Sequence, residues 1–403
     1  MSDLFDAKED QSAQARERDL FERLPRLIEH AKRNSEHYAA IFADLDPKLA
    51  VSRENLSRFP ITRKFNLPAQ QKERPPFGGI NSANIGQMAR VFQSPGPLYE
   101  SQSNELDHWR MGRAFHAAGF RAGDLVHNTL SYHFSPGGFI MDGGARACGC
   151  AVFPAGVGNT DAQIEAINQL QPTGYTGTPS FLIALLTRYQ ELHGDSCSIS
   201  KALVSGEAVT ADMLQVFSDV GIAVSQAYAS AELGLIAYQV DGELGLVVAE
   251  DIIVEIVDPE GVPVQLGDIG EVLVTSLDDK FPLIRYATGD LSAQLPNNEK
   301  SQRSNMRLKG WLGRADSAVK VKGLFVYPHQ VQEICRQHDI KGSLVIERQN
   351  FKDTITFFCQ DSHVSADELQ ATMQSVTKLK GDVLFVPNQQ DTQQPLINDL
   401  RDM

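Results

Sequence analysis

The feature that most constrains the fold of this 403-residue chain is an alternation of helix-like and strand-like segments between about residues 105 and 275. The helix-like segments are amphipathic or rich in small residues, and short apolar runs lie between them. The clearest alternating segments are 106–120 (helix), 123–130 (strand), 137–149 (helix), 151–156 (buried strand), 161–172 (helix), 174–180 (strand), 181–192 (helix) and 201–208 (strand). Such alternation is typical of a largely parallel sheet covered by helices, so we predict an α/β fold.

Other regions depart from this pattern. Apolar runs between residues 234 and 285 are separated by Gly and Asp turns, which favours antiparallel strands and a small β-subdomain. After residue 316 the order becomes helix, two strands, helix and strand, which suits a compact α+β unit. We therefore predict a large N-terminal α/β domain with a β-subdomain over residues 1–313 and a small C-terminal α+β domain over 314–403. A helix over residues 12–43 opens the chain, because apolar residues recur there at helical spacing.

Composition narrows the class of protein. A hydrophobic content of 42% supports a sizeable core, and a net charge of −14 argues against a nucleic-acid partner. No apolar run is long enough to span a bilayer, and the charged N-terminal segment does not resemble a signal peptide. The five cysteines are scattered without the spacing of a zinc site. We expect a cytoplasmic protein with reduced thiols and no membrane partner, and the sequence leaves a homodimer open.

Residues 286–328 carry the strongest chemical pattern. A Thr-Gly-Asp turn presents the carboxylate of Asp290, and about two dozen residues later a second turn presents the guanidinium of Arg314. A basic strand follows at 319–323. A carboxylate can accept hydrogen bonds from both ribose hydroxyls, and an arginine can reach ribose or phosphate oxygens. Either turn alone is explained by a solvated surface, but the two together, in this order, favour a nucleotide.

The stretch resembles the ribose-binding and hinge motifs of adenylate-forming enzymes, the acyl-CoA synthetase superfamily, and is most similar to the phenylacetate-CoA ligase family. Segments 33–38 and 59–67 also resemble that family, and the resemblance extends from Leu20 to Arg401. It implies an ATP-dependent carboxylate–CoA ligase that works in two steps. The acid attacks the α-phosphate of ATP, which gives an acyl adenylate and pyrophosphate, and the thiol of coenzyme A then displaces AMP.

The resemblance assigns residues to the nucleotide and its magnesium ion. The assigned residues are Ser205, Gly206, Glu207, Ala227 and Tyr228 for adenine, Asp290 and Arg314 for ribose and phosphate, and Glu232 for Mg²⁺ and catalysis. Ala231 stands where the family has a hydroxyl residue. For Glu232 by itself, an acid at a helix N-terminus is an alternative explanation, because the helix dipole stabilises acids there.

The resemblance also assigns residues to the lid movement, to CoA and to the acid. Asp316 is the hinge about which the C-terminal domain swivels as a mobile lid, and Lys322 and Gly323 are expected beside the CoA path. The expected acid pocket contains Tyr132, His133, Phe134 and Gly137, with His133 also a candidate catalytic residue. Aromatic side chains before a helix suit an aryl or arylacetic acid. For His133, a packed core histidine is an equally good explanation.

Two departures from the family pattern bear on activity. The phosphate-gripping loop of the superfamily is rich in Ser, Thr and Gly, whereas residues 91–100 contain one Gly and two prolines without N–H donors. The lysine expected near the C-terminus is replaced within residues 393–395 (Gln-Gln-Pro), and Lys378 and Lys380 do not match its position. Loss of one such transition-state contact slows chemistry by roughly 10²–10³-fold.

Two classes of function therefore follow from the sequence. The first is a carboxylate–CoA ligase that uses ATP, Mg²⁺ and CoA, with a carrier-protein thiol as the alternative acceptor. The second is a degenerate relative that binds a nucleotide or acyl adenylate without efficient adenylation. Such a relative is either a binding and regulatory protein or an enzyme of the thioester step alone.

Overall fold

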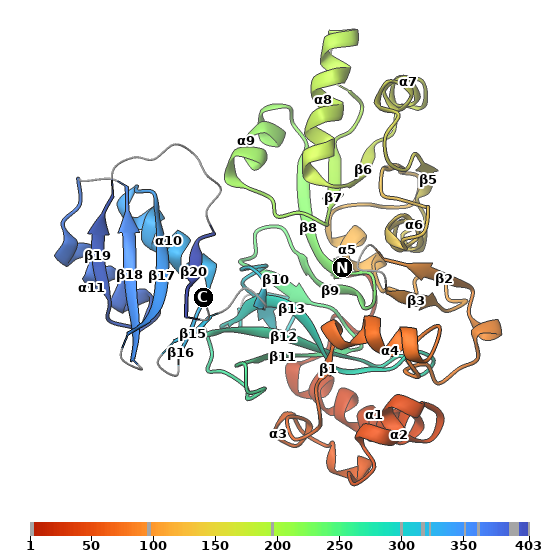
Figure 1. Cartoon of the computed structure of the whole chain (residues 1–403). Helices are drawn as coiled ribbons and strands as arrows, with labels where there is room; N and C mark the ends of the chain where they lie inside the picture. The colour runs from red at the N-terminus through yellow and green to blue at the C-terminus, as the bar shows by residue number, and fades with distance from the viewer. Residues whose placement is uncertain are drawn as a thin grey trace. The chain divides into compact units, whose positions relative to one another are not determined.

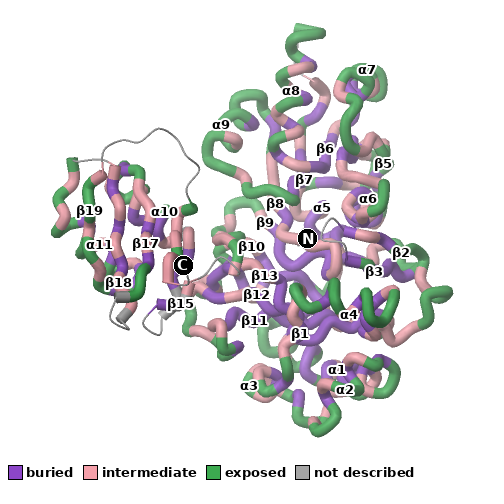
Figure 2. The backbone as a smooth tube through the Cα atoms, viewed as in Figure 1, coloured by how far each residue is buried: buried purple, intermediate pink, exposed green. Residues whose placement is uncertain are grey.

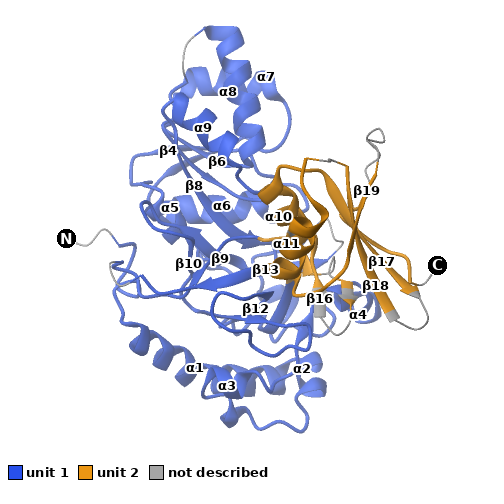
Figure 3. Ribbon diagram, turned by 90° about the vertical axis from the view of Figure 1, so that its left-hand side faces the viewer, with its two compact units in different colours: residues 1–288, 292–311 blue, residues 289–291, 312–403 orange. Residues whose placement is uncertain are grey.

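The structure is a computed structural model that describes residues 4–94, 98–194, 197–298, 301–315, 319–321, 324–349, 352–360, 363–386 and 395–401. The chain forms two compact units (Figure 3). The N-terminal unit contains residues 1–288 and 292–311, and the C-terminal unit contains residues 289–291 and 312–403. The main division lies between residues 311 and 312. In the described part of the chain, no helix has the length and hydropathy of a membrane span.

The N-terminal unit is built on a mixed sheet (Figure 1). Its strands are β1 (Thr62–Arg63), β4 (Leu125–Asn128), β5 (Ala151–Pro154), β6 (Gly174–Gly177), β7 (Lys201–Val204), β8 (Ala223–Ser230), β9 (Gly234–Gln239), β10 (Leu246–Val248), β11 (Ile252–Val257), β12 (Ile269–Ser276), β13 (Leu283–Leu295) and β14 (Arg307–Leu308). They pair in the order β11-β12-β13-β14-β10-β9-β8-β7-β6-β4-β5, and β1 pairs with β13 beside this path.

Strand β8 joins the parallel and antiparallel halves of this sheet. Residues Lys201–Val204 of β7 pair in parallel with the first half of β8, as do β5, β4 and β6 among themselves. From Ala227 onward β8 pairs antiparallel with β9, and the register shifts between Tyr228 and Ala229. The strands expected to form a β-subdomain are therefore antiparallel, as the sequence predicts, but they continue the same hydrogen-bonded order of strands.

Helices and short segments surround the sheet. They are α1 (Ala13–Asn34), α2 (Glu36–Ile41), η1 (Pro47–Leu49), α3 (Arg53–Leu56), η2 (Lys64–Asn66), α4 (Leu67–Glu73), η3 (Ile85–Gln87), the hairpin of β2 (Arg90–Gln93) and β3 (Tyr99–Gln102), α5 (Gly112–Ala117), α6 (Gly137–Ala147), α7 (Thr160–Leu170), α8 (Pro179–His193) and α9 (Ala211–Asp219). Figure 2 shows mostly buried strands and helices whose outer faces are exposed.

Apolar cores lie on both faces of the parallel strands. Along β7, Leu203 packs into one buried cluster, whereas Ala202 and Val204 pack into another with α7, α8 and α9. Alternate side chains of a strand point to opposite faces, so β7 is covered on both sides. Two covered faces are what a parallel sheet with crossover helices requires, and this explains why the parallel strands β6 and β7 are short and mostly buried.

Three sequence predictions are wrong in detail. The helix expected over 12–43 is interrupted at Ser35, whose hydroxyl donates to the Gly79 carbonyl and also accepts from Tyr38 N–H to cap α2. The helix expected over 106–120 begins only at Gly112, because the Asp107 carboxylate caps it by accepting the N–H groups of Met111 and Gly112. The buried strand expected over 151–156 is the edge strand β5, with two of its four residues exposed.

The C-terminal unit is a smaller α+β layer. Its elements are β15 (Val319–Val321), β16 (Leu324–Val326), α10 (Pro328–His338), β17 (Gly342–Gln349), β18 (Lys352–Cys359), α11 (Ala366–Thr377), β19 (Asp382–Phe385) and β20 (Ile397–Asp399). The main sheet has the order β19-β18-β17-β20, and β15 pairs with β16 as a separate hairpin. A buried apolar cluster unites the two helices with this sheet. Strand β20, which pairs in parallel with β17, was not predicted from the sequence.

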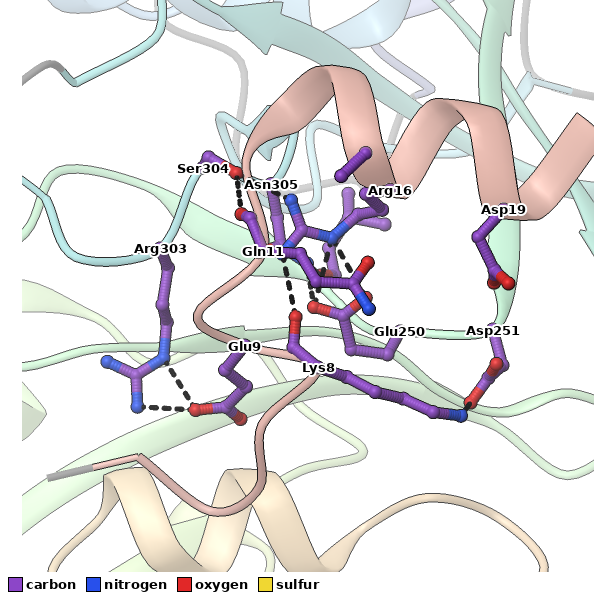
Figure 4. Close-up of polar contacts among 12 residues, drawn as sticks. Lys8, Glu9, Gln11, Arg16, Asp19, Glu250, Asp251, Arg303, Ser304 and Asn305 are labelled. Carbon is purple, nitrogen blue, oxygen red and sulfur yellow. Dashed lines mark hydrogen bonds and ion pairs between the residues drawn. The ribbon is translucent and has the colours of Figure 1, made fainter. Parts of the chain in front are cut away.

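A buried ion-pair network anchors the N-terminal segment to the sheet (Figure 4). The carboxylate of Glu9 is fully buried and accepts hydrogen bonds from Arg113, Arg303 and the Tyr238 hydroxyl at 3.1–3.3 Å. Next to it, the Arg16 guanidinium donates to both oxygens of Glu250 at 2.9 and 3.1 Å. Because buried charges are tolerated only when paired, these contacts fix the segment that precedes α1.

We predict that Glu9→Ala strongly destabilises the N-terminal unit. The variant leaves Arg113 and Arg303 buried without their shared carboxylate, and breaking such a pair typically costs about 3–5 kcal/mol. Urea unfolding followed by tryptophan fluorescence measures the change. The exposed neighbour Asp10 provides the control, and Asp10→Ala should change stability by less than about 0.5 kcal/mol. Equal stability of the two variants would contradict the proposed anchoring.

Candidate active site

Several residues predicted from the sequence lie after the carboxyl ends of parallel strands. The loops that follow β4, β6, β7 and β8 leave one edge of the sheet, because these strands run in the same direction. The Ser205 hydroxyl, in the loop after β7, donates to the Ala227 carbonyl of β8 at 2.8 Å. This bond holds the 205–208 loop beside Tyr228. Such an edge is where open α/β sheets bind their ligands.

The 205–208 loop is held by its acidic residue. The Glu207 carboxylate accepts from the Ser180 hydroxyl at 2.9 Å and from the Ser180 N–H at 3.3 Å, at the start of α8. Gly206 has a φ of 84° and is exposed, so its backbone is open to a flat ligand. Glu207 thus orients the loop through its contact with Ser180. The sequence motif around Glu207 did not indicate this contact.

Tyr228 lies at the irregular point of β8. The ring is half-buried, and its hydroxyl donates to Thr288 Oγ1 of β13 at 3.4 Å. Register shifts of this kind often re-aim a side chain beside a functional site. Ser230, adjacent to the missing hydroxyl at Ala231, accepts from Leu233 N–H through its own Oγ. Ser230 therefore shapes the turn after β8.

Glu232 lies in that turn and is almost completely buried. Its side chain is 3% exposed and forms an ion pair with the Lys64 ammonium at 2.5 Å. Residues 231–233 form a turn between two strands, so the alternative of an acid at a helix N-terminus is wrong. Arg110 also stabilises this turn, because its guanidinium donates to the Leu233 carbonyl.

A second buried carboxylate, Glu100 of β3, was missed in the sequence. Burial, reinforced by the negative charge of Glu232, raises the pKa of Glu100 to about 8, while Ser94 and Lys64 oppose the shift. Burial and the same two carboxylates also raise the pKa of Tyr286. Glu100, Glu232, Lys64 and Tyr286 therefore form one buried polar cluster. The one sequence feature that could have pointed to Glu100 is that it is the only charged residue in the segment 98–103.

Asp290 and Arg314 meet within the C-terminal unit. Arg314 Nη1 lies 3.1 Å from Asp290 Oδ1, and the two residues also form an isolated antiparallel bridge. Gly289 between β13 residues has a φ of 75°, and a Cβ built on it lies 2.5 Å from Arg314 Nη2. The sequence places the two residues in separate turns, but Asp290 lies within β13 and is in direct contact with Arg314. A glycine at position 289 leaves space for the arginine side chain.

The expected acid-pocket segment divides into a fixed and an exposed part. The Tyr132 hydroxyl accepts from the Asn128 amide at 2.8 Å and donates to Asp142 at 3.3 Å, so the ring is held firmly before α6. His133 is exposed, which contradicts the alternative of a packed core histidine. Phe134 is 79% exposed with a φ of 59°, an unusual conformation for an aromatic residue.

Two further aromatic residues complete this region. Phe139, at the third position of α6, packs against Tyr132 with ring centroids 5.1 Å apart and against Phe92 of β2 at 5.4 Å. The backbone of β2 is joined to the same segment, since Gln93 N–H donates to the Phe134 carbonyl at 2.9 Å. Gly137 begins α6. The aromatic cluster is therefore larger than the motif indicated.

Some candidates lie outside the described residues. These are the hinge Asp316, Lys322 and Gly323 of the expected CoA path, Pro95–Pro97 of the altered loop, and Gln393 and Gln394 of the C-terminal segment. The last lysine of the sequence is Lys380. Beyond it, Arg401 pairs with Asp353 at 2.8 Å and with Asp399 at 2.6 Å.

Comparison with known proteins supports this geometry. Residues 102–277 match the AMP-binding enzyme family. A phenylacetate-coenzyme A ligase from Aromatoleum evansii is 30% identical over 356 residues, which cover 83% of this chain and 79% of the relative. The corresponding ligase from Thermus thermophilus is 30% identical over 331 residues, which cover 78% and 73%. The chain therefore belongs to the phenylacetate-CoA ligase family and is an acid–thiol ligase with an AMP-binding domain.

Solved structures confirm the predicted fold. An open conformation of 2-hydroxyisobutyryl-CoA ligase, in complex with its acyl adenylate and CoA, superposes with a TM-score of 0.84. It covers 97% of this chain and 93% of its own at 21% identity. The same ligase in its postadenylation state gives a TM-score of 0.73. The large α/β part and the small α+β part are therefore those of adenylate-forming enzymes.

We predict that Gly289→Ala weakens AMP binding beyond its effect on stability. The new Cβ displaces the flexible Arg314 side chain from Asp290. Gly221 has nearly the same φ, 76°, but open space around it, so Gly221→Ala is the matched control. Both variants should lose about 1–2 kcal/mol of stability from backbone strain, and only Gly289→Ala should lose AMP affinity, by about tenfold in calorimetry. Equal AMP affinity in the two variants would count against this role of the contact.

Proposed function

We propose that the chain joins an aryl or arylacetic acid to coenzyme A through an acyl adenylate. The observation that carries the proposal is the bond from Ser205 Oγ to the Ala227 carbonyl, which brings the adenine-side loop and Tyr228 together at the sheet edge. The aromatic cluster of Tyr132, Phe139 and Phe92 favours an aromatic acid. Relatives of known activity in the same family are phenylacetate-CoA ligases.

In this proposal the nucleotide is held by groups with different tasks. Tyr228 stacks on adenine, and the exposed backbone of Gly206 approaches the ring from the neighbouring loop. Asp290 accepts the ribose hydroxyls, while Arg314 orients the carboxylate and reaches ribose or phosphate oxygens. The acid oxygen attacks the α-phosphorus and pyrophosphate leaves; the sulfur of CoA then attacks the acyl carbon and AMP leaves.

The residues present also suit the magnesium ion that this chemistry uses. Mg²⁺ prefers oxygen ligands and is usually bound by one or two carboxylates together with substrate phosphates. Glu232 provides such a carboxylate, buried and opposed by one ammonium group. A bound Mg²⁺ neutralises charge on the phosphates, while Lys64 and the turn held by Arg110 orient Glu232.

The second step is assigned to the C-terminal unit as a mobile lid. We place its hinge at Asp316, with Lys322 and Gly323 beside the path of CoA, by resemblance to the family. CoA is the proposed acceptor, and a carrier-protein thiol is the alternative. Assays with CoA and with a phosphopantetheinylated carrier protein distinguish the two, because only one of them should discharge the acyl adenylate.

The first step is proposed to be slow. The sequence has no lysine after Lys380, and Lys378 donates its ammonium to the Ser375 carbonyl within its own helix end. Arg401 cannot readily replace the missing lysine, because it is bound by Asp353 and Asp399. The same observations favour the second candidate function, in which the chain binds nucleotide or acyl adenylate and catalyses at most the thioester step.

We predict that Asp290→Ala weakens AMP binding by roughly 10- to 150-fold. A charge-assisted hydrogen bond to ribose contributes about 1.5–3 kcal/mol, and each 1.4 kcal/mol is a tenfold change in affinity. Isothermal titration calorimetry with AMP measures the loss. Asp268, an exposed acid in a turn before β12, is the control, and Asp268→Ala should bind AMP like the wild type. An unchanged affinity in Asp290→Ala would refute the ribose assignment.

A kinetic comparison of the two half-reactions decides between the candidate functions. We expect acid-dependent ATP–pyrophosphate exchange to be roughly 10²–10³-fold slower than in a phenylacetate-CoA ligase that retains the lysine. Thioester formation from a synthetic acyl adenylate and CoA should be much less impaired. Rapid exchange would show that another group replaces the lysine. Absence of both activities, with AMP still bound, would identify a binding protein.

A further inference from the structure

The buried cluster around Glu232 contains a second carboxylate with no assigned task. Glu100 of β3 is 2% exposed, and neither of its carboxylate oxygens has a hydrogen-bond partner among the described residues. The nearby Ser94 hydroxyl lowers the pKa of Glu100, but its hydrogen bond of regular geometry goes to the Leu98 carbonyl at 3.4 Å. A buried carboxylate without donors is costly, so its retention calls for a ligand.

Three neighbours of Glu100 indicate where such a ligand would lie. Glu100 interacts electrostatically with Glu232 and with the Lys64 ammonium. Tyr286 is fully buried and faces both carboxylates, and its hydroxyl has no hydrogen bond of regular geometry within the described part of the chain. Three buried oxygen-bearing side chains, from β3, β13 and the turn after β8, are therefore near enough to interact electrostatically, and none of them has a hydrogen bond of regular geometry among the described residues.

With both carboxylates ionised, the charges in this cluster do not balance. Lys64 contributes one positive charge and lies against Glu232 at 2.5 Å, whereas the two carboxylates contribute two negative charges when ionised. No group of three or more His, Cys, Asp or Glu side chains suited to a metal occurs among the described residues. A pair of carboxylates is nevertheless sufficient for Mg²⁺ when phosphate and water oxygens complete its octahedral shell.

We propose that Glu100 and Glu232 together bind the divalent cation that accompanies ATP. The inference rests on the proposed function, since the phosphates of the nucleotide complete the site. Glu100 is the last residue of the altered phosphate loop, residues 91–100, whose two prolines leave it with fewer backbone donors than the superfamily loop. The cation, held by a second carboxylate, thereby takes over part of the phosphate binding that the loop provides elsewhere. The Glu100 carboxylate suits Mg²⁺ because its oxygens are hard, anionic ligands and have no hydrogen-bond partner among the described residues.

The test uses Mn²⁺ as a paramagnetic probe of the cation site. Binding of Mn²⁺ to the full chain in the presence of ATP is measured by electron paramagnetic resonance, together with AMP affinity by calorimetry in EDTA. Glu100→Gln keeps the shape of the side chain and removes its charge. We expect it to weaken Mn²⁺ binding by tenfold or more and to leave AMP affinity unchanged. Glu73→Gln, on the exposed face of α4, is the control and should behave like the wild type.

The outcomes separate this inference from the proposed function. Loss of Mn²⁺ affinity in Glu100→Gln, with AMP binding intact, supports the two-carboxylate site. Unchanged Mn²⁺ affinity in a folded Glu100→Gln variant overturns it and indicates that Glu100 is held protonated in the core. If Glu100→Gln does not fold, Glu100→Asp takes its place, since a shortened ligand should still weaken Mn²⁺ binding. Failure of the wild type to bind AMP refutes the proposed function instead.

Discussion

The change of direction within β8 is the constraint on which the rest of the N-terminal unit depends. Up to Gln226 the strand pairs in parallel with β7, and from Ala227 it pairs antiparallel with β9. The parallel half brings loops to one edge of the sheet, and the antiparallel half returns the chain through a turn that carries Glu232. A single strand belongs to both halves, so Tyr228 and Glu232 are fixed relative to the 205–208 loop, and the hydrogen bond from Ser205 to the Ala227 carbonyl reinforces this arrangement.

Local periodicity explains which parts of the fold could be predicted. Parallel strands buried on both faces are short apolar runs, and their crossover helices are amphipathic, so the alternation from β4 to β8 is visible in the sequence. The failures occur where a polar side chain overrides the pattern: Ser35 divides the first helix, and Asp107 caps α5 late. Strand β20 is three residues long and depends on pairing with β17, which no local pattern records.

The site shows a similar limit. Motif order proposes Ser205, Tyr228 and Glu232, which lie in or beside loops that leave one edge of the sheet, but it did not indicate that Asp290 and Arg314 contact each other. Motif order did not find Glu100, which reaches the cluster from the β2–β3 hairpin, a tertiary relationship without a sequence signature. It also did not reveal that Lys64 opposes Glu232 from a segment more than 160 residues earlier in the chain.

The altered phosphate loop, the missing lysine and the buried Glu100 can all be related to how charge on the phosphates is neutralised. Adenylation concentrates negative charge on the phosphates, which a lysine and a loop of N–H donors normally neutralise. Here the lysine is absent from the C-terminal segment, yet an additional carboxylate lies buried beside Glu232. Without a cation, Glu100 is mostly protonated near neutral pH, because its pKa is raised to about 8. Once a bound cation ionises it, Glu100 adds one negative charge, which the two positive charges of the cation exceed. On this reasoning Glu100 shifts the task of neutralising phosphate from protein donors to the metal, and the chain should depend on its divalent cation more strongly than a relative with an intact loop.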